Sequence, residues 1–468
     1  MLRTHTCGEL RKGHEAQKAT LCGWVHARRD HGKLIFIDVR DRYGVTQVVF
    51  IPSVCKEAHD TAQKLGPEFV VSITGKVVIR PEKMVNKDIP TGEIELCAEG
   101  LEILNPSEVP VFGINDDVEV SEELRLTYRY LDLRRQKLLR ALEVRHKVCS
   151  IVRSVFNEED FVEVETPVLT KSTPEGARDF LVPARLNPGY FFALPQSPQL
   201  FKQILMVSGL DRYYQIVKCF RDEDLRADRQ LEFTQIDMEM SFVTAEDIFK
   251  VTEKLFKAIF KEIKGIDLPI PFPRMTYAQA QKQYHSDKPD TRKKGEEFAF
   301  TWVVDFPMFK YNEEEKRWDS EHHPFTSVKE EDLVYLKNGE FGKVRANSYD
   351  LVLNGNEIGS GSIRIHKKDI QKRIFDIIGL DEKEAEERFG FLLKAFEYGA
   401  PPHAGVAYGL DRLVAILMGA ESIRDVIAFP KTQKGNCLMT DAPSHVDARQ
   451  LQELGLMMIN KGRTQSLQ

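Results

Sequence analysis

The sequence predicts an α+β protein with more than one domain, in which a small domain of β-strands precedes a larger domain of mixed strands and helices. At 468 residues the chain exceeds what one hydrophobic core normally holds, so two or three domains are expected. Strand-like alternation dominates the first hundred residues, and a long helical pattern begins near Lys137. A charged hairpin between Phe220 and Met240 marks the centre of the larger domain.

The composition is that of an ordinary globular protein. Hydrophobic residues make up 42% of the chain and charged residues 29%, and the apolar runs are too short to span a bilayer. The N-terminal segment is polar and lacks a secretory or transit pattern, so a cytoplasmic location without membrane contact is expected. The net charge of −6 means that any contact with nucleic acid must be local. Seven cysteines without CxxC spacing predict neither a zinc cluster nor a disulfide framework.

The segment from Ala19 to Leu104 alternates as five strands with one short helix. Strand patterns occur in LCGWVHARRD, KLIFIDVRDR and VTQVVFIP, a helical pattern occurs in VCKEAHDTAQKL, and EFVVSITGKVVIRP and GEIELCAEGLEIL complete the set. A helix between the third and fourth of five strands is the order of an OB-fold barrel, a platform for single-stranded nucleic acid. A generic small β domain is the alternative. We therefore predict a domain over 1–104, a Pro- and Gly-containing linker over 105–117, and a second domain over 118–468.

The hairpin at the centre of the second domain has a polar face and an apolar face. Its returning strand alternates, so that Gln235, Asp237 and Glu239 face one way and Ile236, Met238 and Met240 face the other. This pattern suits a strand with helices behind it and a polar cleft in front. Arg221 stands at the mouth of that cleft, where a guanidinium can bind phosphate. A charged hairpin tip that is merely solvated is the alternative.

Two further segments flank the hairpin. Residues 137–159 form a helical pattern with a broad apolar stripe, followed by the strand FVEVETPVLT, and together they predict either a dimer interface or intramolecular packing. GVAYGLDRLVAILMG runs from a strand into a helix, which places Arg412 at the start of that helix. Neither a GxxxxGK[ST] loop nor a strand-linked GxGxxG occurs in the sequence, so the common parallel-sheet nucleotide sites have no support.

Three separated stretches match one known pattern: the long helix with Thr166-Pro167, the hairpin sequence Phe220-Arg221-Asp222-Glu223, and Gly409-Leu410-Asp411-Arg412. They resemble the three motifs of class II aminoacyl-tRNA synthetases. The stretches TPEGARDF, LPQSPQLFKQ, WVVDFPMF, HHPF, NGNEIGSGSIRIH and YGLDR are similar to aspartyl-tRNA synthetases of the bacterial type, and the match covers nearly the whole chain.

The resemblance implies a catalytic domain with an antiparallel sheet flanked by helices, an OB-fold that reads the anticodon, and a homodimer. The implied ligase forms aspartyl-adenylate from L-aspartate and ATP, and then transfers the aspartyl group to tRNA-Asp. One departure is clear, because bacterial members usually carry an insertion domain between HSDKPDTR and WVVDFPMF. This chain has only a short joint near 285–300.

The resemblance also assigns the nucleotide site. Arg221 and Arg412 are the implied catalytic residues, with Arg221 on the α-phosphate and the substrate carboxylate, and with Phe233 and Arg412 on opposite faces of adenine. The residues expected to contact ATP are Arg221, Asp222, Glu223, Gln230, Phe233, Glu357, Gly409, Leu410, Asp411 and Arg412. Asp350 and Glu357 flank a turn and are expected to hold Mg²⁺ between the phosphates.

The aspartate site is expected to combine two cations with acids for the ammonium group. Lys202 and Arg364 would hold the β-carboxylate, Glu175 and Asp237 would hold the ammonium, and either His322 or His323 would close over the substrate. The full set implied by the resemblance is Glu175, Ser197, Gln199, Lys202, Arg221, Asp237, His322, His323 and Arg364.

The barrel residues expected to contact the anticodon are Arg29, His31, Phe36, Gln47 and, more weakly, Arg80. Relatives that charge tRNA-Asp alone typically carry Leu at the position of His31, whereas relatives that also charge tRNA-Asn often carry His. An imidazole can donate or accept, so charging of tRNA-Asn is also expected. Two alternatives are an asparaginyl-tRNA synthetase and an inactive paralogue that serves as an RNA-binding module.

Overall fold

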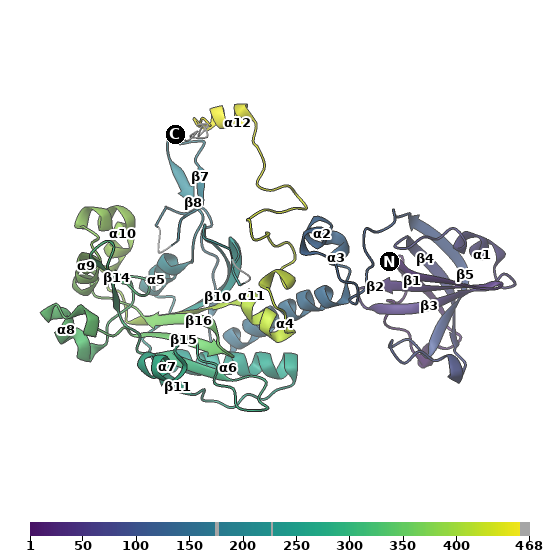
Figure 1. Cartoon of the computed structure of the whole chain (residues 1–468), viewed down its shortest axis with the longest axis horizontal. Coiled ribbons are helices and arrows are strands. Elements are labelled where there is room, and N and C mark those ends of the chain that lie inside the picture. Colours follow the sequence, from purple (N-terminus) through teal and green to yellow (C-terminus); the bar gives the residue numbers. More distant parts are fainter. Residues whose placement is uncertain (174–176, 226–227, 459–468) are drawn as a thin grey trace, which may run out of the picture. The chain divides into compact units, whose positions relative to one another are not determined.

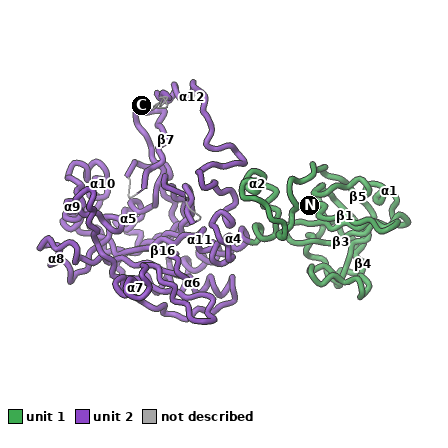
Figure 2. Tube along the Cα trace, in the orientation of Figure 1, with its two compact units in different colours: residues 1–140 green, residues 141–468 purple. Residues whose placement is uncertain are grey.

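The computed structural model of the chain describes residues 1–173, 177–225 and 228–458, which form two compact units over 1–140 and 141–468 (Figures 1 and 2). Glu175 therefore lies outside the described residues. None of the described helices is long and apolar enough to cross a membrane.

The first unit contains a closed barrel of five strands in the order β1-β2-β3-β5-β4. The strands are β1 (Lys18–His31), β2 (Leu34–Asp41), β3 (Gly44–Phe50), β4 (Val70–Ile79) and β5 (Ile94–Asn105). Helix α1 (Lys56–Ala62) lies between β3 and β4, as the strand pattern predicts, although it is shorter than the predicted segment. Alternate side chains such as Leu21, Ile37 and Ile73 fill the interior, because strand residues point to opposite faces in turn. The OB-fold prediction is confirmed.

Residues 106–140 pack with the barrel in this unit and include the short helices α2 (Glu122–Thr127) and α3 (Arg129–Asp132). Glu68 connects the barrel to residues 106–140. Its carboxylate accepts hydrogen bonds from Arg40 of β2 at 2.9 and 2.8 Å and from Arg134 at 2.7 Å. Glu68 and Arg40 are buried, so this pairing satisfies charges that would otherwise be costly to bury.

The second unit is built on an eight-stranded sheet in the order β11-β12-β15-β16-β17-β10-β9-β6. Its strands are β6 (Val162–Glu163), β9 (Arg212–Phe220), β10 (Glu232–Ser241), β11 (Arg274–Thr276), β12 (Phe300–Val304), β15 (Ser348–Leu353), β16 (Asn356–Ile363) and β17 (His403–Gly409). The central pairs are antiparallel, as expected, and only the edge pairs β11–β12 and β6–β9 are parallel.

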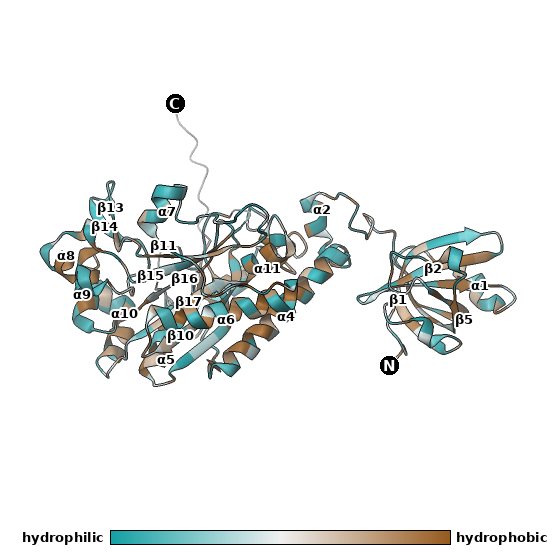
Figure 3. Cartoon of the chain, turned by 90° about the horizontal axis from the view of Figure 1, so that it is seen from below, coloured by the Kyte–Doolittle hydropathy of each residue, from teal (hydrophilic) through white to brown (hydrophobic). Residues whose placement is uncertain are grey.

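One face of this sheet packs against long amphipathic helices. Helices α4 (Gln136–Glu158) and α6 (Ala245–Lys264) contribute apolar side chains to the largest core, and hydrophilic and hydrophobic bands alternate along α4 (Figure 3). Helix α6 begins at a capping box of Thr244 and Asp247 and ends at Gly265, whose φ of 72° suits a residue without a side chain. These signals fix the length of the helix behind β10.

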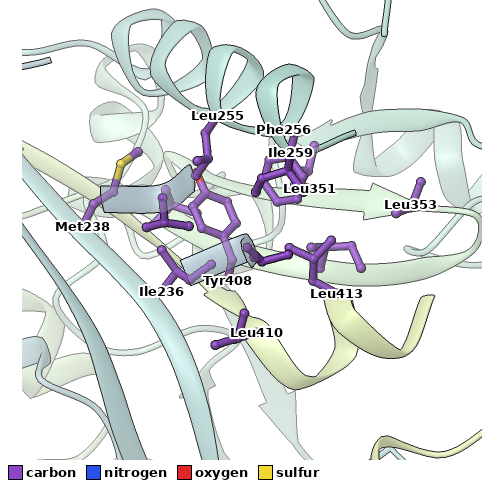
Figure 4. Close-up of a cluster of buried hydrophobic side chains, with 14 of the residues drawn as sticks. Ile236, Met238, Leu255, Phe256, Ile259, Leu351, Leu353, Tyr408, Leu410 and Leu413 are labelled. Atoms are coloured by element: carbon purple, nitrogen blue, oxygen red, sulfur yellow. The ribbon is translucent and has the colours of Figure 1, made fainter. Parts of the chain in front are cut away.

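The apolar side of β10 faces this core. Figure 4 shows a cluster that includes Ile236 and Met238 of β10, Tyr408 of β17, and Leu255, Phe256 and Ile259 of α6. The opposite side of β10, with Gln235 and Asp237, lines a cavity. The predicted division of this strand into a core face and a cleft face is therefore confirmed.

The remaining helices of the second unit are α5 (Gln199–Val207), α7 (Tyr277–Tyr284), α8 (Leu333–Asn338), α9 (Lys368–Ile377), α10 (Glu382–Phe396), α11 (Leu410–Met418) and α12 (Ala448–Glu453). Short 3-10 turns occur in this unit at Glu330–Asp332, Phe341–Lys343 and Ile423–Asp425, and in the first unit at Lys12–His14 and Glu82–Met84. Two small hairpins pair β7 (Leu181–Pro183) with β8 (Phe191–Ala193) and β13 (Phe309–Asn312) with β14 (Arg317–Ser320). Residues 285–299 connect α7 to β12 without a helix or strand, as predicted for a short joint.

A glycine on β17 makes room for a buried carboxylate on β10. A Cβ atom at Gly405 would lie 1.8 Å from Oε2 of Glu239 and 2.3 Å from the carbonyl oxygen of Met238. Glu239 is fully buried, so its side chain has no free space into which it can move. The residue type at 405 is therefore dictated by packing.

We predict that Gly405→Ala lowers the unfolding free energy of the second unit by about 1–3 kcal/mol or more, because overpacking displaces Glu239 or the backbone. Scanning calorimetry measures the change. Gly100→Ala is the matched control, since a Cβ at this strand glycine meets no atom within 4 Å. Equal effects of the two substitutions would contradict the packing argument.

Candidate active site

A cavity of about 430 Å³ opens on the polar side of the large sheet, between strands β10, β16 and β17 and helices α5 and α11. Most of the residues predicted from the motifs line it. They are Ser197, Gln199, Lys202, Arg221, Glu223, Gln230, Phe233, Asp237, His322, His323, Glu357, Arg364, Gly409, Asp411 and Arg412. Segments separated by more than two hundred positions in the sequence thus meet at one site.

The inner end of the cavity is lined by two cations, Lys202 and Arg364, and by Asp237, and both cations also pair with Glu239. All four side chains are almost fully buried. Nζ of Lys202 lies 2.6 Å from Oδ1 of Asp237 and 3.2 Å from Oε2 of Glu239. Arg364 donates from Nε and Nη2 to the two oxygens of Glu239 at 2.9 and 3.1 Å. The two predicted cations are present, but each is already paired with an acid. The formal charge of the four groups sums to zero when both acids are ionised.

The pKa values of the two acids shift in opposite directions. Burial alone would raise the pKa of Glu239, but Arg364 and Lys202 outweigh burial and lower the pKa to about 2. Burial raises the pKa of Asp237, although Lys202 opposes the change. Within the described structure, Oδ2 of Asp237 is buried and has no hydrogen-bond partner. An unpaired buried acceptor of this kind is typical of a site that awaits a donor from a ligand.

The two adjacent histidines lie in different surroundings. His323 contacts Nη1 of Arg364 through Nε2 at 2.5 Å, and burial lowers its pKa well below the usual range. His322 packs edge-on against Phe306 at 5.0 Å, and burial lowers its pKa to about 4. Nε2 of His322 is buried without a partner among the described residues. Both rings are neutral at physiological pH, and His323 is the one next to the inner cations.

The outer part of the cavity carries the two motif arginines, and both contact protein groups. The Arg221 guanidinium lies over the ring of Phe233, with 5.0 Å between Cζ and the ring centroid. Arg412 donates to the backbone oxygen of Glu357 at 2.5 Å and to Asp228 at 3.1 Å. The predicted helix start at Arg412 is confirmed by α11. The sequence did not predict that Arg221 stacks on Phe233.

Several predicted nucleotide contacts are engaged within the protein instead. The side chain of Leu410 is buried in the core, so it cannot face a ligand in the cavity. Asp222 is exposed and is not among the residues that line the cavity. Asp411 lines the cavity, but its two oxygens accept from Arg145 at 2.5 Å and from the backbone N–H of Thr234 at 2.8 Å.

Gln230 and Glu223 also have partners in the protein. The amide of Gln230 bonds twice to the backbone of Lys431, at 3.0 and 2.7 Å, and so fixes a segment 201 positions away. Glu223 pairs with Arg229 at 3.1 Å. For Gln230 the structure therefore shows a role in holding the wall of the cavity.

The predicted metal acids lie on neighbouring strands β15 and β16. Burial raises the pKa of Asp350 well above its usual range, and the charge of Glu357 raises it further. Oδ1 of Asp350 is buried and unpaired within the described structure, while Glu357 pairs with Lys288 at 3.0 Å. Two acids that repel each other suit a divalent cation. The described residues contain no group of three or more His, Cys, Asp or Glu side chains that could hold a metal ion, so a cation at these two acids would need further ligands from outside the protein.

The predicted anticodon residues gather on one face of the barrel. Arg29 pairs with Asp38 at 2.6 Å and donates to Gln47 at 3.1 Å, and Gln47 donates to Glu95 at 2.7 Å. His31 and Phe36 stack edge to face with 5.8 Å between their centroids. Arg80 is buried beside Glu95, and its Nε and Nη2 lack hydrogen-bond partners in the described structure.

Comparison with known proteins places this architecture in a family. The model of the tRNA synthetases class II (D, K and N) matches residues 121–433, and an OB-fold nucleic acid binding domain matches residues 19–104. The chain belongs to the class II tRNA synthetases. The prediction made from the three motifs is therefore confirmed.

This class II synthetase is similar over nearly its whole length to curated relatives. It is 44% identical to the aspartate--tRNA(Asp/Asn) ligase of Dictyoglomus turgidum, with 98% of each chain covered. It is 45% identical to the ligase of the same name from Thermoanaerobacter pseudethanolicus, with 97% of this chain and 98% of that one covered. The first alignment spans 584 positions, more than the 468 residues of this chain, so the relative carries segments that this synthetase lacks.

Solved structures share the fold. The asparaginyl-tRNA synthetase of Pyrococcus horikoshii with asparaginyl-adenylate matches with a TM-score of 0.75 and 25% identity, over 92% of this chain and 99% of that one. The aspartyl tRNA synthetase of Entamoeba histolytica matches with a TM-score of 0.73 and 23% identity, over 91% and 90% of the two chains. The second likeness shows the fold alone.

Among the residues that the sequence did not assign to a site, Glu239, Lys288 and Glu95 pair directly with assigned ones. Glu239 shares a strand face with Asp237, so the period of two already placed it in the polar row. Lys288 lies in the HSDKPDTR stretch, and its pairing with Glu357 has no local signal. Glu95 on β5 accepts a hydrogen bond from Gln47 on β3. These two strands pair in parallel, and no turn motif in the sequence predicts that pairing.

We predict that the stability contributed by Glu239 depends on pH in the acid range. The unfolded carboxyl titrates near 4.5 and the folded one near 2, so the unfolded chain takes up the proton first. The contribution is present above pH 4.5 and is lost as the pH falls toward 2. The difference in unfolding free energy between the wild type and Glu239→Gln should therefore shrink over this interval. A difference that does not change with pH would contradict the ionised state of Glu239.

Proposed function

We propose that this class II synthetase is an aspartate--tRNA ligase that charges both tRNA-Asp and tRNA-Asn. The single observation that carries the amino-acid assignment is the pair of buried cations, Lys202 and Arg364, at the inner end of the cavity. Relatives with 44–45% identity that bear this name support the proposal. We further propose that both steps of the reaction, formation of aspartyl-adenylate and transfer of the aspartyl group to tRNA, occur in the large unit, while the barrel selects the tRNA.

The inner cations retain enough donors for a substrate carboxylate. Arg364 has five N–H groups, of which three donate to Glu239 and Ser362 and a fourth faces Nε2 of His323. Lys202 has three N–H groups and two acidic partners. The β-carboxylate of aspartate would take the remaining donors, which adds a negative charge to a group of charges that is otherwise balanced. A neutral amide would gain much less from this site.

The acids of the site would hold the ammonium group. Oδ2 of Asp237 is a buried acceptor without a partner in the described structure, and Gln199 lines the same cavity. Binding of aspartate would supply the missing donor. Of the two histidines, we propose His323 as the residue next to the β-carboxylate, because it contacts Arg364. Glu175 remains a candidate from the resemblance alone.

In the first step, an oxygen of the α-carboxylate of aspartate attacks the α-phosphorus of ATP. The bond from the α-phosphorus to the bridging oxygen breaks, and pyrophosphate leaves with that electron pair. The protein forms no covalent bond, so alignment and charge must supply the rate. Arg221 would move from the ring of Phe233 to the α-phosphate, and adenine would take its place between Phe233 and Arg412.

The acids Asp350 and Glu357 fit a magnesium ion. Within the described structure Asp350 carries an unpaired buried oxygen, and the mutual repulsion of the two carboxylates would be relieved by a divalent cation. The ion would neutralise phosphate charge when ATP is bound. Lys288, which pairs with Glu357, would then be released toward the phosphates.

In the second step, a hydroxyl of the terminal ribose of tRNA attacks the aspartyl carbonyl, and AMP leaves. The barrel would bind the anticodon through the face that carries Arg29, Phe36 and Gln47. Their arrangement offers a ring for stacking, an amide for hydrogen bonds and a guanidinium for phosphate. Arg80, whose Nε and Nη2 lack hydrogen-bond partners in the described structure, would give a further contact.

We also propose that the chain forms a homodimer. Apolar side chains are exposed on the segments that follow α4, among them Val162, Val168 and Leu169, and on the β7–β8 hairpin at Leu181 and Phe191. Exposed apolar residues gathered in this way are typical of a subunit interface. Light scattering should give the mass of two chains, and the mass of one chain would contradict the proposal.

The nearest alternative is an asparaginyl-tRNA synthetase. The structural similarity to the Pyrococcus horikoshii enzyme supports this alternative. Exchange of pyrophosphate into ATP, measured separately with aspartate, asparagine and lysine, tests the assignment. We expect exchange with aspartate to dominate. A larger signal with asparagine would overturn the proposal, and no exchange with any of the three would indicate an inactive RNA-binding paralogue.

We predict that Lys202→Met raises the KM for aspartate about a hundredfold, or roughly 3 kcal/mol, because it removes a buried charge that faces a carboxylate. The KM for ATP should change by less than about threefold, since adenine binds at the other end of the cavity. Lys218→Met, at an exposed lysine of β9, is the matched control. Equal losses for both substrates would contradict the role of Lys202.

We predict that His31→Leu lowers the charging of tRNA-Asn relative to tRNA-Asp by about tenfold, since the loss of one hydrogen bond to a base is worth roughly 1–3 kcal/mol. His31 is exposed at the end of β1 and packs against Phe36, where it can reach an unstacked base. Aminoacylation of the two purified tRNAs measures the ratio. Wild-type charging of tRNA-Asn that is already negligible, with no change in the variant, would overturn dual specificity.

A further inference from the structure

Behind the aspartate end of the cavity, a chain of hydrogen bonds fixes the amide of Gln199. Nε2 of Gln199 donates to Oε1 of Gln203 at 3.0 Å, and Nε2 of Gln203 lies 3.0 Å from Nε2 of His403. Nδ1 of His403 lies 2.7 Å from the carbonyl oxygen of Pro401. Gln203 and His403 are fully buried, and Gln199 lines the cavity. The chain thus joins α5 to β17 and ends at the ligand site.

The direction of every bond in this chain follows from Pro401. A carbonyl oxygen can only accept, so Nδ1 of His403 carries the proton. Burial lowers the pKa of His403, which keeps the ring neutral and leaves its Nε2 as an acceptor. Gln203 must therefore turn its nitrogen toward His403 and its oxygen toward Gln199.

The same logic sets the orientation of Gln199. Only the amide nitrogen of Gln199 can donate to the oxygen of Gln203, so its Oε1 lies on the branch that points away from Gln203. Gln203 follows Gln199 by four positions on α5, and residues at this spacing share one face of a helix. A free glutamine amide has two orientations of similar energy, whereas this one has a single orientation.

We propose that Gln203 and His403 are positioning residues that hold Gln199 with its amide oxygen, rather than its nitrogen, toward the α-ammonium of aspartate. This inference rests on the proposed function and adds two residues to its site. A reversed amide would place an N–H group against the ammonium, so that two donors would face each other. The buried chain prevents that reversal before the substrate arrives.

The test begins with Gln203→Leu in ATP–pyrophosphate exchange. We expect the KM for aspartate to rise about tenfold, because a factor of about ten corresponds to the loss of one hydrogen bond to a charged group. The KM for ATP should change by less than about twofold. Ile204→Ala on the same helix is the control for loosened packing, because Ile204 packs in the core beside α5 and takes no part in the amide chain. It should leave both KM values within about twofold.

A double-mutant cycle separates orientation from general damage. In the Gln199→Glu background the side chain presents oxygen on both branches, so the oxygen in the cavity no longer depends on Gln203. Adding Gln203→Leu to that background should cause no further rise in the KM for aspartate. A merely structural role of Gln203 would multiply the KM by the same factor in both backgrounds.

The outcomes distinguish the inference from the function on which it rests. If the wild type shows no aspartate-dependent exchange, the proposed function fails. If the wild type is active but Gln203→Leu leaves the KM for aspartate unchanged, raises both KM values equally, or acts equally in both backgrounds, the positioning role is wrong. His403→Phe, which removes the acceptor at Nε2, should reproduce the split between the two KM values.

Discussion

The buried arrangement of Lys202, Asp237, Glu239 and Arg364 is the constraint on which the second unit depends. An isolated charge in such a place would be expensive, and each of these charges is tolerated because an opposite charge lies within hydrogen-bonding distance. The arrangement requires α5, β10 and the end of β16 to meet within a few ångströms. It also requires a glycine at position 405, since any side chain there would occupy the space of Glu239.

The same principle of balanced charge recurs across both units. Arg412 pairs with Asp228, Lys288 with Glu357, and Arg29 with Asp38. Each cation is held near the position where the proposed phosphates, carboxylates or bases would bind. An anionic ligand must then displace a carboxylate of the protein from the cation, so weakly charged ligands bind less well. In the absence of a ligand, the carboxylate keeps the cation ordered. Removal of one member of such a pair therefore affects both stability and binding.

Hydrogen bonds within the protein also fix the orientation of side chains around the cavity. The amide of Gln230 is fixed by the backbone of Lys431, and Asp411 joins Arg145 to the backbone that follows Phe233. These contacts connect the hairpin, α4 and α11 around the region proposed for adenine. The amide chain through Gln199 is the counterpart at the end proposed for aspartate. Both ends of the cavity are thus organised from behind by residues that need not touch a ligand.

The sequence by itself determined the features that depend on local periodicity. Alternation along β10 separated Asp237 from Met238, strand order around α1 predicted the barrel, and the pattern before Arg412 predicted the start of a helix. The motif resemblance then supplied the family. Only the tertiary structure decided which of these groups meet, because the acidic partners of Lys202 and Arg364 and the histidine partner of Gln203 lie 35 to 200 positions away. It also placed the Leu410 side chain in the core, since burial depends on neighbours that no local pattern contains.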